Sequence, residues 1–310
     1  MISIVQLGTI DYATGLKLQQ QLVALRKEDK IGDVLLLLEH KPVITLGRNA
    51  RTANVVASTE LLAQRGVELF ECDRGGDVTF HGPGQIVGYP IFDLRGFPRR
   101  ADDDPSNDLS SRAEENDSQN RSSQSRDLAF TRRHLGAVDF VRRLEEVLMR
   151  TCADFAIPTR RIPGLTGVWT DPAADLKGRD FSRAESGRKG AASAAEGRES
   201  KLAAIGIHIS RSVTSHGFAL NVDTDLSYFN LIVPCGITSK PVTSMQRELG
   251  RELDLTAVAE SISRNFGVVF QSQMLWVDTL DALLGCTVGV PVTPPAELRQ
   301  LHKDDDSTWA

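Results

Sequence analysis

Residues 73 to 89 combine the residue types of a binding wall more densely than any other stretch of the chain. They read Asp-Arg-Gly-Gly-Asp-Val-Thr-Phe-His-Gly-Pro-Gly-Gln-Ile-Val-Gly-Tyr, with five glycines, an arginine and a histidine. Glycine lets a backbone turn through positive φ and lets a ligand approach closely, at an entropic cost. We interpret this segment as one wall of a ligand site. A pair of tight hairpin turns is the alternative.

Cys235 is the candidate nucleophile. It sits in a Pro-Cys-Gly corner at the end of an apolar run, where a turn would expose its sulfur. Most cysteines are inert buried side chains. We expect this of Cys72 and Cys152, which lie in strand and helix patterns, whereas Cys286 has no convergent polar neighbours. The four cysteines lack the spacing of a metal site, so no metal is expected.

A thiol with a pKa near 8.5 needs a neighbouring base or cation to act as a nucleophile at neutral pH. His81, His208, His216 and Lys201 are the candidates. His208 fits a strand side chain that points to solvent. Lys201 directly precedes the strand-like run Leu-Ala-Ala-Ile-Gly, where most lysines are solvated charges. The residue types alone leave this choice open.

Six motifs in series resemble the lipoyl(octanoyl) transferases. They are Asp73-Arg-Gly-Gly, Thr79-Phe-His-Gly-Pro-Gly-Gln, Gly167-Val-Trp, Lys201-Leu-Ala-Ala-Ile-Gly, His216-Gly-Phe-Ala-Leu-Asn-Val and Pro234-Cys-Gly. The resemblance runs from about Leu35 to Glu248. It implies an α/β (α+β) single domain with a mixed β-sheet, similar to the catalytic domains of biotin protein ligases and lipoate ligases.

The resemblance also implies roles for residues at the matching positions. Cys235 would be the nucleophile and Lys201 its acid/base partner. The substrate-binding positions would be Arg74, Gly75, Gly76, Thr79, His81, Gly82, Gly84, Gln85, Ala204, Ile205, Gly206, His216, Gly217 and Ala219. Small residues, Ala203 among them, would line a tunnel for the acyl tail. Backbone N–H groups beside Cys235 or along Lys201–Gly206 would stabilise an oxyanion.

The implied reaction moves an octanoyl (or lipoyl) group from acyl carrier protein to a lysine of a lipoyl domain through a cysteine thioester, without a cofactor. The acceptors would be lipoyl domains of 2-oxo acid dehydrogenases and the glycine cleavage H protein. Three other interpretations remain open at this point. They are an ATP-dependent lipoate or biotin protein ligase, an amidotransferase between lipoyl domains, and a binding scaffold without catalysis.

The elements that must position these residues follow from hydrophobic periodicity. Helices are expected at Tyr12–Asp29, at Leu135–Phe155, at Leu255–Phe266 with Asp254 as its cap, and in a short segment that starts at Ser58 or Thr59 and stops at Gly66. Strands are expected at the N-terminus and at Val34–Glu39, Val43–Leu46, Val67–Cys72, Ile86–Leu94, Leu202–Ser210 and Val213–Val222. The mixture favours a mixed sheet covered by helices.

Composition bounds the remaining possibilities. The chain has 310 residues, of which 41% are hydrophobic, and a net charge of −5, which argues against a nucleic-acid binder. It has no apolar run of transmembrane length and no signal-peptide pattern, so we expect a cytoplasmic protein without a membrane partner. We expect one catalytic domain over residues 1–290, interrupted by disordered insertions at 99–127 and 171–200, and a polar tail at 291–310.

Arginines on and near the 135–155 helix could form a docking surface for acidic carrier and lipoyl domains. They are Arg132, Arg133, Arg142, Arg143, Arg150, Arg160 and Arg161. Such a surface predicts weaker transfer at high salt, because exposed charge pairs are screened over about 8–10 Å. An ordinary charged helix face is the alternative.

Overall fold

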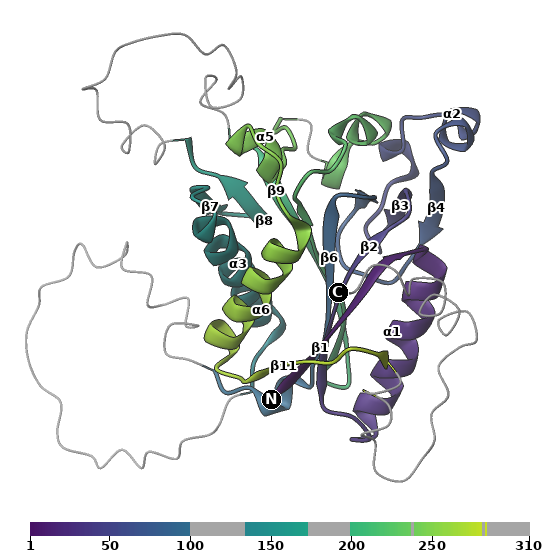
Figure 1. Cartoon of the computed structure of the whole chain (residues 1–310). Coiled ribbons are helices and arrows are strands. Elements are labelled where there is room, and N and C mark those ends of the chain that lie inside the picture. The colour runs from purple at the N-terminus through teal and green to yellow at the C-terminus, as the bar shows by residue number, and fades with distance from the viewer. Residues whose placement is uncertain (100–133, 173–198, 237–238, 281–282, 284–310) are drawn as a thin grey trace, which may run out of the picture.

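A mixed eight-stranded sheet forms the centre of the molecule (Figure 1). The computed structural model describes residues 1–99, 134–172, 199–236, 239–280 and 283. The strand order is β11-β1-β2-β6-β10-β9-β8-β7. The strands are β1 (Ile2–Ile10), β2 (Asp33–His40), β6 (Gln85–Ile91), β7 (Thr159–Ile162), β8 (Leu165–Thr170), β9 (Lys201–Ser210), β10 (Val213–Asn221) and β11 (Met274–Trp276). β1 pairs in parallel with β2 and β11, and the other neighbours are antiparallel.

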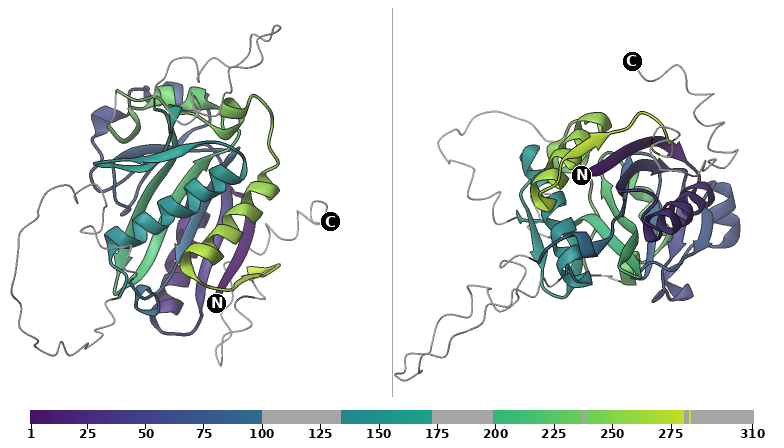
Figure 2. Two further views of the ribbon diagram at one scale, coloured as in Figure 1. Left: turned by 90° about the vertical axis from the view of Figure 1, so that its left-hand side faces the viewer. Right: turned by 90° about the horizontal axis from the view of Figure 1, so that it is seen from below.

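Helices cover both faces of this sheet. Helix α1 (Tyr12–Lys27) packs on one face, and α3 (Ala137–Asp154) and α6 (Leu255–Phe270) lie side by side on the other (Figure 2). Strand β2 shows why two layers form, because its leucines alternate between them. Leu35 and Leu37 enter the core under α3 and α6, whereas Leu36 and Leu38 enter the core under α1. The run 34–39 is therefore a central strand, as its dense apolar sequence predicted.

A second, three-stranded sheet holds the glycine-rich wall. Its order is β4-β3-β5, with β3 (Val43–Leu46) between β4 (Glu68–Glu71) and β5 (Val78–His81). Helix α2 (Thr59–Gln64) packs its Leu62 into the small core of this sheet. The segment from Leu226 to Gly236, which carries two 3-10 turns, closes over the same core. This arrangement brings Cys235 next to β5.

The expected elements agree with the structure over most of the described chain. Ser58 and Asp254 cap α2 and α6 through their side chains, as predicted. Periodicity did not identify the short strands β5, β7, β8 and β11. The strand predicted at 86–94 ends at Ile91, because Asp93 accepts the Arg95 N–H and starts a 3-10 turn.

The insertions predicted at 99–127 and 171–200, apart from their ends, and the tail predicted at 291–310 lie outside the described residues. At the ends of the second segment, Asp171 N–H donates to Pro158 and Ser200 O accepts from Thr170 N–H. Among the helices of the described residues, none has both the length and the apolar character needed to cross a bilayer.

Candidate active site

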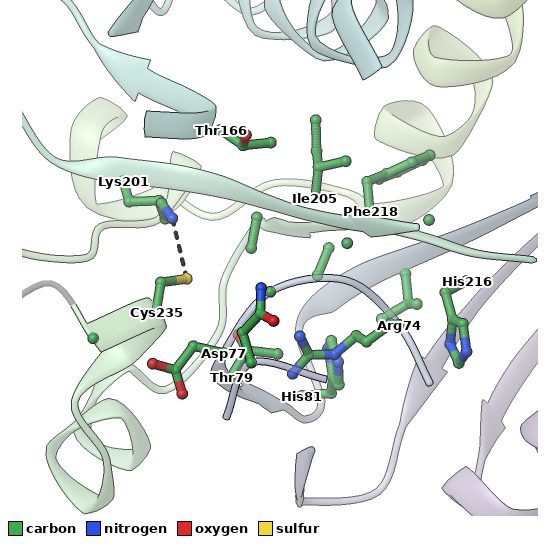
Figure 3. Close-up of a pocket in the computed structure, with 18 of the residues that line it drawn as sticks. Arg74, Asp77, Thr79, His81, Thr166, Lys201, Ile205, His216, Phe218 and Cys235 are labelled. Atoms are coloured by element: carbon green, nitrogen blue, oxygen red, sulfur yellow. Dashed lines mark hydrogen bonds between the residues drawn. The ribbon is translucent and has the colours of Figure 1, made fainter. Parts of the chain in front are cut away.

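Cys235 and Lys201 meet in the wall of a cavity of about 590 Å³ (Figure 3). The Lys201 Nζ lies 3.2 Å from the Cys235 Sγ. Lys201 is the first residue of β9, and its N–H and C=O bond to Pro241 and Thr243, which fixes its backbone. An amine and a thiol at this distance can exchange a proton directly.

The turn that carries Cys235 holds the residue in an uncommon backbone conformation. Its φ is +56° and its ψ is +20°, in the left-handed region that is uncommon for residues other than glycine. The Gly236 N–H donates to Val233 O and closes the turn. Such conformations persist only when the surroundings over-determine them, and they cluster at functional sites. The Pro-Cys-Gly corner predicted from the sequence is therefore present.

Most of the residues expected to bind substrate surround this cavity. They are Arg74, Gly76, Thr79, His81, Ala204, Ile205, Gly206, His216, Gly217 and Ala219. Figure 3 shows Ile205, Phe218 and Thr166 on one side of the β9 ribbon, and Cys235, Arg74 and His81 on the other. The cavity wall combines apolar and polar groups, since the Tyr12 and Tyr89 rings also line it.

The remaining expected residues lie away from the main cavity wall. Gly82 and Gly84 form the turn between β5 and β6, where the Gly84 N–H donates to Glu39 and its carbonyl accepts from Thr224 Oγ1. Gly75 bonds to the Ile207 carbonyl of β9. Gln85 lines only a small adjoining void beside Cys235. Ala203, expected in the acyl tunnel, is fully buried in the core under α3 and α6, because successive strand residues face opposite sides.

Arg74 ties the glycine-rich loop to β3. Its Nε donates to Thr45 Oγ1 at 3.1 Å and its Nη2 to Thr45 O at 2.7 Å. The loop then packs directly on β9, where a Cβ on Gly206 would lie 2.7 Å from Gly75 O. Only glycine permits that approach, so the Arg-Gly-Gly and Ile-Gly motifs form one contact.

His81 is held neutral with one tautomer. Gln85 Nε2 donates to Phe80 O and Asn221 Oδ1, so its Oε1 is the acceptor for His81 Nδ1–H at 2.7 Å. The His81 Nε2 then carries a lone pair. Burial lowers the His81 pKa to about 3, because the charged form loses its hydration. His81 is therefore suited to accept a hydrogen bond in the cavity.

His216 and Asp73 form a pair farther along the cavity. The His216 Nε2 lies 2.7 Å from Asp73 Oδ1, and His208 Nε2 lies 3.6 Å from the other oxygen. Burial lowers the pKa of His216, and the Asp73 carboxylate opposes that shift. His208, expected to point to solvent, instead reaches Asp73 and keeps a fifth of its side chain exposed. The proximity to Cys235 selects Lys201 over the three histidines as its partner.

Two backbone N–H groups near Cys235 and Lys201 already donate hydrogen bonds within the protein. The N–H of Lys201 donates to Pro241 O and that of Gly236 to Val233 O. These two groups, expected as oxyanion donors, are therefore already engaged. Among the described residues, no group of three or more His, Cys, Asp or Glu side chains could hold a metal.

The arginines expected to form a docking surface are largely paired with carboxylates. Glu145 accepts from Arg142 and Arg161, and Glu146 from Arg150 and Arg161. Arg160 pairs with Glu199, and Arg143 donates to the Pro98 carbonyl. Arg132 and Arg133 lie outside the described residues. The helix face is thus closer to an ordinary charged surface than to a uniformly basic one.

Two residues beside Cys235 and Lys201 were not assigned from the sequence. The Trp169 ring lies under Lys201, with Nζ 4.8 Å from its centroid. Asp77 accepts from Asn54 Nδ2 beside Gly236 and lines the cavity. Trp169 belongs to the Gly167-Val-Trp motif, and Asp77 directly follows the Asp73-Arg-Gly-Gly motif. Their place in or beside these motifs was the signal in the sequence that could have identified them.

Comparisons with known proteins agree with this geometry. Residues 11–106 and 128–267 match the model of the family "Lipoyl protein ligase A/B catalytic domain". An octanoyltransferase of Koribacter versatilis is 50% identical over 307 residues, which cover 98% of either chain. An octanoyltransferase of Acidobacterium capsulatum is 48% identical over 286 residues, covering 92% of this chain and 96% of that protein.

Solved structures show the same fold at low identity. A lipoate-protein ligase A bound with ATP matches with a TM-score of 0.55 at 12% identity, covering 98% of this chain and 94% of that one. The bi-partite lipoate protein ligase of Thermoplasma acidophilum gives a TM-score of 0.55 at 13% identity, covering 98% and 91%. The predicted fold class, an α/β (α+β) domain with a mixed sheet like that of lipoate ligases, is confirmed. The chain belongs to the lipoyl protein ligase A/B catalytic domain family and, within it, to the octanoyltransferases.

Proposed function

We propose that this protein transfers an octanoyl group from acyl carrier protein to a lysine of a lipoyl domain, with Cys235 as nucleophile and Lys201 as acid and base. The contact of 3.2 Å between Lys201 Nζ and Cys235 Sγ carries the proposal. The octanoyltransferase relatives support the acyl group, since they share about half of this sequence.

In the first half-reaction the Lys201 amine takes the Cys235 proton, and the thiolate attacks the thioester carbonyl of octanoyl-acyl carrier protein. The tetrahedral intermediate collapses when the C–S bond to the phosphopantetheine sulfur breaks. Lys201 returns its proton to that leaving sulfur. The products are an octanoyl-Cys235 thioester, a neutral Lys201 amine and the carrier protein with a free thiol.

In the second half-reaction the neutral ε-amine of the acceptor lysine attacks the Cys235 thioester. Lys201 accepts the proton that the attacking nitrogen loses, and the Cys235 thiolate leaves. An amide forms, and the thiolate lies beside an ammonium again, ready for the next donor. The conversion of a thioester to an amide is downhill, so the proposal requires no ATP and no cofactor.

The proposed partners follow from this chemistry. The donor is octanoyl-acyl carrier protein, and the acceptors are lipoyl domains of 2-oxo acid dehydrogenases and the glycine cleavage H protein. We place the reaction in the cytoplasm, where the enzyme would meet both the carrier protein and the lipoyl domains. Arg74, His81 and His216 would line the binding site of the acyl chain, because all three line the same cavity as Cys235.

Mass spectrometry after incubation with octanoyl-acyl carrier protein alone tests the proposal. We expect an added octanoyl mass on the Cys235 peptide, labile to hydroxylamine, and no added mass in Cys235→Ala. Addition of a lipoyl domain should then discharge the enzyme and acylate the domain. An unmodified enzyme that transfers only with ATP, Mg²⁺ and free octanoate would overturn the proposal in favour of a ligase. Transfer only from an octanoylated lipoyl domain would favour an amidotransferase.

A further inference from the structure

The side chain of Lys201 lies against a buried aromatic ring that the reaction above does not use. The Lys201 Nζ is 4.8 Å from the centroid of the Trp169 ring, while it lies 3.2 Å from Cys235 Sγ. Trp169 is 1% exposed, and its indole N–H donates to Leu165 O at 3.3 Å, which fixes the ring's orientation. The amine is therefore placed between a sulfur and the face of an indole.

The strand that carries Trp169 is itself fixed next to Lys201. Gly167, two residues earlier on β8, has a φ of +124°, and a Cβ there would lie 2.5 Å from Ala203 O and 3.4 Å from Lys201 Cε. Its N–H donates to Glu145 Oε1 at 3.1 Å. Glu145 is fully buried on α3. The carboxylate thus holds the Gly167 backbone close to the lysine side chain.

An indole face attracts an ammonium group through its quadrupole, but it has no comparable attraction for a neutral amine. When the Cys235–Lys201 pair holds a single proton, it exists either as thiol and amine or as thiolate and ammonium. A ring beneath the nitrogen stabilises the second form. Burial of the ring strengthens the effect, because water does not screen it.

We propose that Trp169 is a positioning residue that favours proton transfer from Cys235 to Lys201 and so raises the thiolate fraction at neutral pH. The catalytic consequence rests on the proposed function, but the proton equilibrium itself does not. A second ammonium, Lys240 Nζ, lies 5.9 Å from the same centroid and pairs with Glu199. Its charge is balanced by that carboxylate, so Lys201 is the cation that gains from the ring.

Alkylation of Cys235 by iodoacetamide, followed on its own peptide by mass spectrometry from pH 6 to pH 10.5, tests this inference without substrate. The variants are Trp169→Leu, which removes the aromatic face, and Trp169→Phe, which keeps a weaker one. Since only the thiolate reacts, we expect the rate near pH 7 to fall about 10-fold in Trp169→Leu and less in Trp169→Phe. All rates should converge above about pH 10, where the thiol ionises unaided.

Two matched controls separate this role from a loss of packing. Leu148→Ala truncates a fully buried side chain of the core under α3 and α6, a cluster that does not include Lys201. Lys240→Met removes the second cation near the ring. Both should keep the pH dependence of the parent. A parent-like curve in Trp169→Leu, or a fall of equal size at every pH, would overturn the inference. Octanoyl transfer that fails while the alkylation shift persists would overturn the proposed function alone.

Discussion

The amine of Lys201 lies 3.2 Å from the sulfur of Cys235, although 34 positions separate the two residues in the chain. Lys201 starts a central strand, whereas Cys235 sits in a turn beside β5. A strand of the eight-stranded sheet and a turn packed beside the three-stranded sheet must therefore keep their positions for the pair to persist. A contact between a rigid strand and a strained turn suits a catalytic pair better than an incidental surface contact.

Lys201→Arg distinguishes a role of Lys201 in proton transfer from a role that needs only its positive charge. Arginine keeps a positive charge, but its guanidinium stays protonated in proteins and cannot accept the thiol proton. We expect the rate of acyl-enzyme formation from octanoyl-acyl carrier protein to fall by about 10²–10⁴-fold, the usual size of an acid–base contribution. Lys201→Met should fall at least as far. Quenched-flow mass spectrometry measures the rate, and near-parental formation in Lys201→Arg would show that only charge matters.

Two buried histidines should make the fold sensitive to acid. Burial lowers the pKa of His81 to about 3 and that of His40 to about 4, below the ordinary 6.5. Between these values the unfolded chain binds a proton that the folded chain does not. The free energy of unfolding should therefore decrease as the pH falls from 6.5 to about 4, by about 1.4 kcal/mol per pH unit for each histidine.

His81→Asn tests this pH dependence, because its amide can still donate to Gln85 Oε1. Denaturant unfolding from pH 4.5 to 6.5 should give a slope smaller than that of the parent by about 1.4 kcal/mol per pH unit. Glu39 works in the opposite sense, since burial raises its pKa, but it is common to both proteins. Identical slopes would mean that His81 is not buried in its neutral form.

The sequence predicted the contact of Cys235 with Lys201, the proposed catalytic pair, through motifs, and it predicted the fold through periodicity. The Pro-Cys-Gly corner and the helix caps are local features, and local chemistry determines them. Glycine-rich segments are harder to interpret, because glycine serves turns and ligand walls equally well. Gly76 lines the cavity, whereas Gly82 and Gly84 meet the demands of a turn. Nothing in the residue types separates the two uses.

Long-range pairings lie beyond a single sequence. Arg142 and Arg150 of α3 and Arg161 of β7 suggested a basic surface. In the fold, however, these arginines pair with Glu145 and Glu146 of α3. The contact of Trp169 with Lys201 likewise depends on the β8–β9 register, which shifts between Val168 and Trp169 so that Trp169 pairs with Lys201. Neither helical periodicity nor motif matching encodes such a register.

Glu145→Gln should destabilise the fold more than the neighbouring Glu146→Gln. Glu145 is fully buried, accepts the Gly167 N–H and pairs with Arg142 and Arg161. Loss of its charge removes the ion pair with Arg142 and one of the two ion pairs of Arg161, which still pairs with Glu146. We expect about 1–3 kcal/mol less stability in denaturant unfolding.

Glu146→Gln is the matched control, because Glu146 pairs with Arg150 and Arg161 but keeps a third of its side chain exposed. Exposed pairs contribute little, so we expect a loss of at most about 1 kcal/mol. Equal losses in the two variants would show that the buried carboxylate has no special role in holding β8.

Asp73→Asn should lower the pKa of His216 further, because the carboxylate now opposes the effect of burial. The asparagine oxygen can still accept from Nε2, so the geometry is kept while the charge is lost. Titration of the His216 ring by NMR measures the shift. His208→Asn gives the opposite expectation, since the coulombic effect of His208 lowers the His216 pKa and its removal should raise that pKa slightly. Shifts of the same sign in both variants would contradict an electrostatic origin, because Asp73 raises the pKa of the His216 imidazole whereas His208 lowers it.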